Sequence, residues 1–419
     1  MIAHSEPRRF PRGLRRALFF GMAFLVVVPR AGAGTKEERD AARGVFLAEE
    51  NIVAQCVYRP KPEDVVWGAL AGLARDLGPD YARFFPPKRS GSFDEARDAY
   101  WLALLALEDE RNIPLKALVA RSIRAYCRSI DRHSDYDDYE TWAKVHETFK
   151  FNNASIGVTL SEWKGEDFIL LPFRDGPGER AGIVNGDVLM EVNGTSVRGM
   201  SKLEVLAMCA GKEGSRVTLK VRHADGTEES IAVMHEQAVA SPLAVEQTTS
   251  GIRVTCHQIF DQAAEDFRKL LASLRAGQDL TIDFRGCSIG SVPAAVKMAS
   301  LFLPAETVVC KLETAKGQEK LISPNKTPYR PSKLTILQDR FTASSAELVI
   351  AALVGNRGLH VETRGERTFG KGVTVMQVEI AADASGRTAG ILLITDTRIY
   401  GPNNEVWDGE GLPPTVKKK

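Results

Sequence analysis

Residues 334–354 have the sequence LTILQDRFTASSAELVIAALV, and this stretch is the most informative about the fold class. Leu334–Leu337 favour a buried strand, a polar turn follows, and Ala346–Val354 form an apolar run of helical character. Ser344 lies at the turn, and Glu347 follows it in the S-x-x-E pattern of a helix capping box. A strand that leads directly into a buried helix is the repeating unit of an α/β domain, so we expect an α/β core here.

The same alternation of strand and helix continues on both sides of this stretch. We predict strands at 252–256, 280–284, 360–362 and 391–395, and helices at 263–274 and 293–303. This assigns residues 239–419 to the α/β core.

Residues 151–238 have a different pattern, with short strands separated by tight turns. Asn193-Gly194 and Asp225-Gly226 are strong turn signals, and one helix is predicted over Ser201–Cys209. About 80 residues is a usual size for a small independent domain.

The N-terminal part is predicted to be a signal peptide followed by helices. Residues 1–33 combine a basic start, a short apolar run and the small-residue site Ala31-Gly32-Ala33, a pattern typical of an exported protein. Residues 34–150 show helical periodicity, with helices predicted around 65–77, 93–108 and 114–130. We therefore expect a periplasmic or secreted location after cleavage, with the export route left open.

Composition excludes some functions. Lys plus Arg (55) and Asp plus Glu (54) nearly cancel, so the basic excess of a dedicated nucleic-acid-binding protein is missing. The six cysteines form no CxxC pair, so no metal site is predicted. Cys56 with Cys127 is one candidate disulfide in an exported chain, while free buried thiols are favoured for the later four.

Ser344 and Lys371 are candidate catalytic residues. Lys371 lies between two glycines in the segment Thr368-Phe369-Gly370-Lys371-Gly372. A serine hydroxyl needs a base, and a lysine can serve if its site lowers its pKa from the ordinary value of about 10.4. Taken singly, Ser344 is a helix cap and Lys371 a turn residue. A Ser-His-Asp triad using His360 is disfavoured by the better lysine pattern.

Residues 151–238 resemble a PDZ domain of the bacterial protease type. The resemblance rests on Ser155-Ile156-Gly157-Val158 and on the Gly182-Ile183-Val184-Asn185-Gly186-Asp187 turn. It implies that Ile156, Gly157 and Val158 bind the C-terminal carboxylate of a peptide, which adds as a strand to a sheet edge.

The whole mature chain resembles the carboxy-terminal processing peptidases, or tail-specific proteases. The matching segments are 131–136 (DRHSDY), 283–285 (DFR), 341–347 (FTASSAE), 368–372 (TFGKG) and 397–414. The resemblance implies an α+β multidomain protein with an N-terminal helical region, an inserted PDZ domain and a crotonase-like α/β protease core. It implies Ser344 as nucleophile and Lys371 as general base, with the Ser345 amide and one from the 286–290 loop, assigned to Gly290, as the oxyanion hole. The resemblance implies no metal and no cofactor.

Two departures from the family pattern concern the residues that support this dyad. Ile289 occupies a position where the family has glycine in the oxyanion loop. The family's lysine-orienting glutamine position is Val375 here, and Gln377 lies two residues further on the same strand face. Gln377 is therefore included in the candidate catalytic set, on the condition that the strand slides or bulges.

The expected function is an exported serine endopeptidase that cleaves proteins at or near their C-termini, with the PDZ domain capturing the substrate tail. The expected partners are proteins or peptides with free C-terminal tails and no nucleic acid; membrane-surface association, oligomeric state and substrate identity stay open. One alternative is a catalytically impaired PDZ adaptor on the same fold. Another is a ligand carrier, which would retain an apolar molecule.

Overall fold

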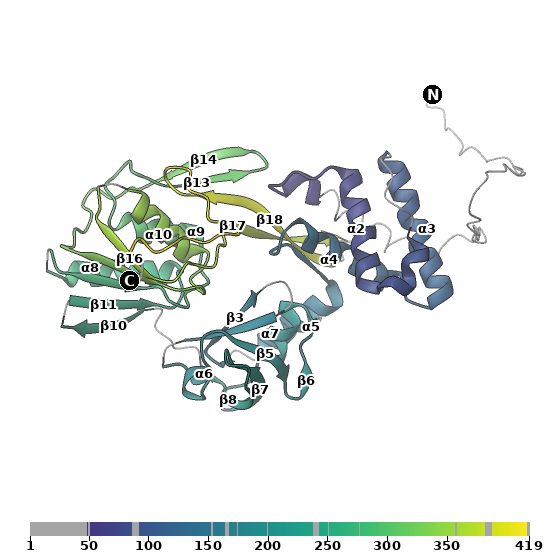
Figure 1. Ribbon diagram of the computed structural model, residues 1–419, viewed down its shortest axis with the longest axis horizontal. Helices are drawn as coiled ribbons and strands as arrows, with labels where there is room; N and C mark the ends of the chain where they lie inside the picture. The colour runs from purple at the N-terminus through teal and green to yellow at the C-terminus, as the bar shows by residue number, and fades with distance from the viewer. Residues whose placement is uncertain are drawn as a thin grey trace, which may run out of the picture. The chain divides into compact units, whose positions relative to one another are not determined.

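The computed structural model describes residues 48, 51–85, 92–151, 154–163, 167–173, 175–198, 200–237, 243–249, 251–275, 277–356, 358–381 and 388–416 (Figure 1). The predicted signal peptide, residues 1–33, lies outside the described residues. Within those ranges, no helix is long and apolar enough to cross a membrane.

The C-terminal core is built on a five-stranded sheet in the order β10-β11-β12-β15-β16. Its strands are β10 (Leu243–Thr248), β11 (Gly251–Cys256), β12 (Leu280–Asp283), β15 (Leu334–Gln338) and β16 (Val361–Gly365). The last four run parallel, and β10 is antiparallel to β11. Parallel neighbours need crossover connections, which here include the helices α8 (Asp261–Ser273), α9 (Val292–Ser300) and α10 (Ser345–Gly355).

A second sheet is antiparallel and centres on the long strand β18 (Thr388–Tyr400). It pairs with β17 (Val373–Ala381), with β13 (Val308–Thr314) and with β1 (Asp135–Asp138), while β14 (Gly317–Ile322) pairs with β13. The strand β1 lies inside the range that the sequence assigned to helices, so that assignment was wrong for these residues. Its pairing with β18 is a contact between distant parts of the chain, which local periodicity does not reveal.

The N-terminal region contains α2 (Pro62–Leu77), the 3₁₀ helix η1 (Pro79–Phe84), α3 (Phe93–Arg111), α4 (Leu115–Ile130) and α5 (Tyr139–Phe151). Its core includes the fully buried Leu73, Leu104 and Leu118. Ile380, Leu392 and Ile394 of the β17–β18 hairpin join the same core. The six cysteines are free thiols, so Cys56 and Cys127 are both buried but not bridged.

A third unit holds a six-stranded sheet in the order β3-β4-β5-β7-β8, with β6 paired to β5. Its strands are β3 (Val158–Trp163), β4 (Asp167–Pro172), β5 (Asp187–Val192), β6 (Thr195–Ser196), β7 (Arg216–Arg222) and β8 (Glu228–Met234), and its helices are α6 (Pro177–Arg180) and α7 (Lys202–Met208). A short pair, β2 (Ala154–Ser155) with β9 (Glu236–Gln237), lies at its two chain ends. The predicted domain boundaries at 150/151 and 238/239 stay predictions.

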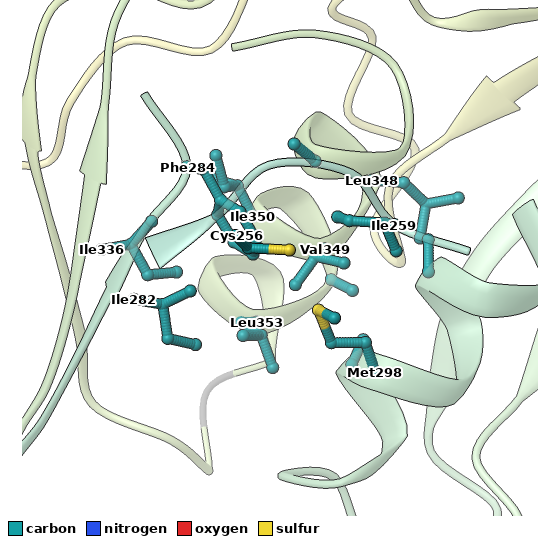
Figure 2. Close-up of a cluster of buried hydrophobic side chains, with 14 of the residues drawn as sticks. Cys256, Ile259, Ile282, Phe284, Met298, Ile336, Leu348, Val349, Ile350 and Leu353 are labelled. Atoms are coloured by element: carbon teal, nitrogen blue, oxygen red, sulfur yellow. The ribbon is translucent and has the colours of Figure 1, made fainter. Parts of the chain in front are cut away.

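Helix α10 is embedded in the core rather than lying on its surface. Every residue from Ser345 to Leu353 is buried, and Figure 2 shows Leu348, Val349 and Leu353 among side chains that include Ile282 and Ile336. The helix start at Ser344 is therefore held by the packing of the whole helix.

We expect Leu348→Ala to lower the free energy of unfolding by about 2–5 kcal/mol, because Leu348 is fully buried and truncation leaves a cavity. Chemical denaturation measures the change. The matched control is Val354→Ala on the same helix, where the side chain is 39% exposed and a change within about 0.5 kcal/mol is expected. Equal losses at both positions would contradict the embedded position of α10.

Candidate active site

The candidate catalytic segments gather at one edge of the parallel sheet. The 284–290 loop follows β12, the 339–344 turn follows β15, and the 366–371 segment follows β16. Because these strands are parallel neighbours, their carboxyl ends lie at the same edge. This edge is where open α/β sheets usually hold their sites.

Hydrogen bonds join these loops to one another. Ala343 donates its N–H to the Cys287 carbonyl (2.9 Å), and Thr342 Oγ1 donates to the Phe284 carbonyl (2.9 Å). The Asp339 carboxylate accepts from the Gly286 N–H (3.2 Å) as well as from amides of its own turn. The turn before Ser344 and the loop after β12 therefore form one connected structure.

Ser344 has an unusual backbone conformation, with φ +58° and ψ −119°. Non-glycine residues rarely adopt this region, at a cost of about 1–3 kcal/mol, and such strain is concentrated at functional sites. In the run 341–353, Ser344 is the only residue that is not buried. The strained turn therefore presents this serine at the surface of an otherwise buried segment, as a nucleophile on a strand-to-helix elbow requires.

Two other capping boxes in the chain show that the strain is not a property of the S-x-x-E pattern. Ser92 at the start of α3 has φ −66° and ψ 165°, and Ser201 at the start of α7 has φ −73° and ψ 156°. Both are ordinary extended N-cap conformations. Ser344 shares their sequence pattern and differs in backbone geometry.

The proposed oxyanion donors lie beside Ser344. Ser345 is buried at the first position of α10, where a backbone N–H has no acceptor within the helix. Ile259 donates to the Ile289 carbonyl (3.0 Å) and accepts from the Ser291 N–H (2.9 Å), so the N–H of Gly290 points to the other side. A Cβ at Gly290 would overlap Ser345 Oγ, which places this glycine directly against the start of α10.

Ile289, the departure from the family glycine, fits this loop. Within the described part of the chain, the residues with positive φ include Gly286 but not Ile289. A β-branched residue is therefore accommodated at this position without backbone strain.

The Lys371 segment is fixed from several sides. Glu347 accepts from the Thr368 hydroxyl (2.5 Å) and from the amides of Gly370 (2.7 Å) and Lys371 (2.8 Å). The same carboxylate accepts from the Ser344 amide (2.9 Å). The backbone N–H groups of Ser344 and Lys371 thus donate to the same oxygen atom, Glu347 Oε2.

Two further segments hold the lysine loop. The Gly370 carbonyl accepts from the Gly409 N–H (2.9 Å) and from Arg132 Nη2, and the Arg132 guanidinium lies over the Phe369 ring. The Leu412 N–H donates to Thr368 Oγ1 (2.6 Å). The segments around Arg132 and Gly409–Leu412 therefore position Lys371.

Burial, with the nearby basic side chains of Lys371, Arg132 and Lys202, lowers the pKa of His133 to about 3. His133 is accordingly a neutral imidazole near Lys371 at neutral pH. His360 is exposed and precedes β16, whereas Ser344 follows β15, so the two residues lie at opposite ends of parallel strands. The placement of His360 gives no support to a triad.

Gln377 lies on β17 opposite Leu393 and is exposed. The pairing of β17 with β18 has the register irregularity that the sequence analysis required, between Thr374 and Val375. The role of Gln377 stays a prediction.

The predicted peptide-binding residues lie at the start of β3. Ile156 and Gly157 are buried, and Val158 begins β3, which is the edge strand of its sheet. Gly157 has φ +64°, and its carbonyl accepts from the Phe173 N–H (2.8 Å). A Cβ at Gly157 would also collide with Pro177, so only glycine fits this turn.

Sequence reasoning missed three groups that organise the site. Glu347 was interpreted only as a helix cap, and neither Arg132 nor Asp339 was given a role. The sequence signal for these three roles was weak. Each residue lies within or beside a segment that was singled out for other residues, and no pattern marks it separately. Among the described residues, no group of His, Cys, Asp and Glu side chains could hold a metal ion.

The described residues contain an α/β domain, with a strained serine turn at the carboxyl edge of its parallel sheet, and a separate small β-sheet unit. Comparison with known proteins is specific: residues 251–418 match Peptidase family S41, and residues 174–223 match the PDZ domain. Residues 251–418 are therefore similar to the serine-type peptidases of family S41, and residues 174–223, which precede them in the chain, are similar to the PDZ domain. The α+β multidomain prediction is confirmed.

Two relatives from Bacillus subtilis (strain 168) are similar over most of this chain. Carboxy-terminal processing protease CtpA is 27% identical over 304 residues, which is 72% of this chain and 64% of that protein. Carboxy-terminal processing protease CtpB is 24% identical over 341 residues, which is 79% of this chain and 69% of that protein. The chain thus spans about two thirds of the length of these relatives.

A solved structure, the photosystem II D1 C-terminal processing protease, has the same fold. Its TM-score is 0.67 at 20% identity, with 92% of this chain and 94% of that chain covered.

We expect Ser344→Gly to melt at a higher temperature than Ser344→Ala, because glycine adopts φ +58° without strain. Calorimetry measures the difference. The control is the same pair of substitutions at Ser92, where the backbone is extended and only the ordinary N-cap preference separates glycine from alanine. The difference in the free energy of unfolding between the glycine and alanine variants should be larger at Ser344 than at Ser92 by about 1–2 kcal/mol. Equal differences at the two positions would contradict a strained turn.

Proposed function

We propose that this chain is an exported endopeptidase that cleaves protein substrates near their C-termini, with Ser344 as nucleophile and Lys371 as general base. The observation that carries the proposal is the shared contact of both residues: their backbone amides donate to one oxygen of Glu347, and Ser344 occupies a strained, partly exposed turn. The export part rests on the N-terminal sequence pattern.

In the proposed first step, neutral Lys371 Nζ takes the proton of Ser344 Oγ while Oγ bonds to the substrate carbonyl carbon. The resulting oxyanion accepts hydrogen bonds from the N–H groups of Ser345 and Gly290. The C–N bond then breaks, and the protonated lysine gives its proton to the leaving amine. Water then attacks the acyl carbon while Lys371 takes its proton; the bond from that carbon to Ser344 Oγ breaks, Lys371 returns the proton to Oγ, and the carboxylic acid product leaves.

The proposed role of the PDZ domain is to bind the free C-terminus of the substrate. Within the described ranges β3 pairs with β4 alone, which leaves a side to which an extended peptide can add, and α7 lies next to β3. The Gly157 turn directly before β3 is the proposed contact for the terminal carboxylate.

Ser344→Ala and Lys371→Ala should each abolish cleavage of an unstructured peptide with a free C-terminus, because either change removes an atom that forms or breaks a bond. Mass spectrometry of the products measures cleavage, and circular dichroism checks that both variants fold. A fluorophosphonate should label Ser344 in the wild type. Full activity in either variant overturns the dyad, and a folded wild type that is neither active nor labelled would favour the adaptor alternative.

Gly157→Ala should raise KM for the same peptide while kcat changes little, because the turn that presents the carboxylate contact is displaced. Amidation of the peptide C-terminus should have the same effect in the wild type. The control is Gly226→Ala. This change also forces alanine to a positive φ (+87°), but among the described residues no atom beyond the chain neighbours lies within 4 Å of the added Cβ. A KM that is insensitive to both Gly157→Ala and amidation would refute tail capture by this unit.

A further inference from the structure

The Glu347 carboxyl group is fully buried and accepts four hydrogen bonds. Oε1 accepts from Thr368 Oγ1 (2.5 Å) and the Gly370 N–H (2.7 Å), and Oε2 accepts from the N–H groups of Lys371 (2.8 Å) and Ser344 (2.9 Å). Four is about the number of acceptor sites that a carboxylate offers, so both oxygens are saturated.

These contacts exceed what a helix cap needs. In the boxes at α3 and α7, the carboxylates of Glu95 and Glu204 accept from the amides of their own N-cap residues, Ser92 and Ser201. Glu347 makes the equivalent bond to Ser344 and accepts three more from the 368–371 segment. It therefore connects two segments that meet only in the folded protein.

The donors define the protonation state that this geometry requires. Three of the four partners are backbone N–H groups, which only donate, so a proton added to Oε2 would face a donor and break a hydrogen bond. A proton added to Oε1 would require the Thr368 hydroxyl to change from donor to acceptor. The position of Glu347 in the first turn of α10 also favours a negative charge. The contacts are thus those of an ionised carboxylate.

We propose that Glu347 is a positioning residue whose ionised carboxylate holds Ser344 and Lys371 at reacting distance, and that its protonation loosens this link. This inference rests on the proposed Ser344/Lys371 function. It assigns Glu347 no contact with substrate and no part in proton transfer to it.

Burial raises the pKa of Glu347 to about 7, although its four hydrogen bonds act in the opposite direction. Titration of this group therefore falls in the range where a hydrolase is assayed. Charged or titratable groups on the surrounding segments are Lys371 itself, Arg132 and His133 before β1, Asp339 after β15, and Asp408 and Glu410 near the C-terminal end.

The central experiment compares Glu347→Asp and Glu347→Gln with the wild type. Aspartate keeps the charge but lacks the reach to span both segments, so kcat should fall roughly 100-fold with little change in KM, as expected for reacting groups displaced by about 1 Å. Glutamine keeps the size but does not ionise. Below pH 7, the rise of log kcat/KM with pH should be steeper in the wild type than in Glu347→Gln by a slope of one, because only the wild type must lose the Glu347 proton.

Thr368→Val is a second test that does not depend on the folding of the Glu347 variants. It removes one of the hydrogen bonds that lower the pKa of Glu347, so that pKa should rise and the acid limb of the profile should move to higher pH. An unshifted limb overturns the ionisation role.

The control is Glu95→Gln, which alters a capping box in α3 without a connection to the dyad and should leave kcat and the slope unchanged. Wild-type kcat in both Glu347 variants, or an equal loss in Glu95→Gln, overturns the positioning role. The rate of fluorophosphonate labelling of Ser344 separates the two proposals. If the wild type and Glu347→Asp are labelled at the same rate, the positioning role of Glu347 is wrong but the proposed function still stands. If the wild type is not labelled, the proposed function itself is contradicted.

Discussion

The buried carboxylate of Glu347 is the interaction on which the arrangement of the site depends. It joins the start of α10 to the segment after β16, and so adds to the parallel pairing of β15 with β16 and to the hydrogen bond from the Phe369 N–H to the Thr342 carbonyl (2.9 Å). Burial raises its pKa, so the ionised form is less favourable inside the protein than in water. Hydrogen bonds from four donors compensate for part of that cost and fix the geometry at the same time.

The rigidity of the surroundings makes this geometry possible. Helix α10 is buried along Ser345–Leu353, and its start carries the strained Ser344 backbone, which a looser segment would relax. Hydrogen bonds join the Asp339 turn to the Cys287 loop, so the proposed nucleophile and the proposed oxyanion donors lie in one connected structure. The lysine segment is added to that unit by Glu347, by Arg132 and by the Gly409–Leu412 segment.

Much of the fold could be predicted because its signals are local. The strand–turn–helix pattern at 334–354, the alternation through the C-terminal core and the turns of the PDZ unit depend on neighbouring residues, and the structure contains these elements. The strand β1 was missed because its acidic sequence has no strand periodicity and is held in place by β18. The fit of Ile289 was equally hidden, since the departure from glycine matters only if φ is positive, and φ is set by the surrounding loops.

The sequence by itself determined the order of the segments, the PDZ-like unit and the candidate pair Ser344 and Lys371, because residue types and spacing encode these directly. The S-x-x-E pattern alone did not separate Ser344 from the caps Ser92 and Ser201, because all three serines share it. The folded structure adds two differences, a strained backbone at Ser344 and a carboxylate that reaches from α10 to the Lys371 amide. Both are consequences of packing between residues far apart in the chain, which periodicity and local propensity do not register.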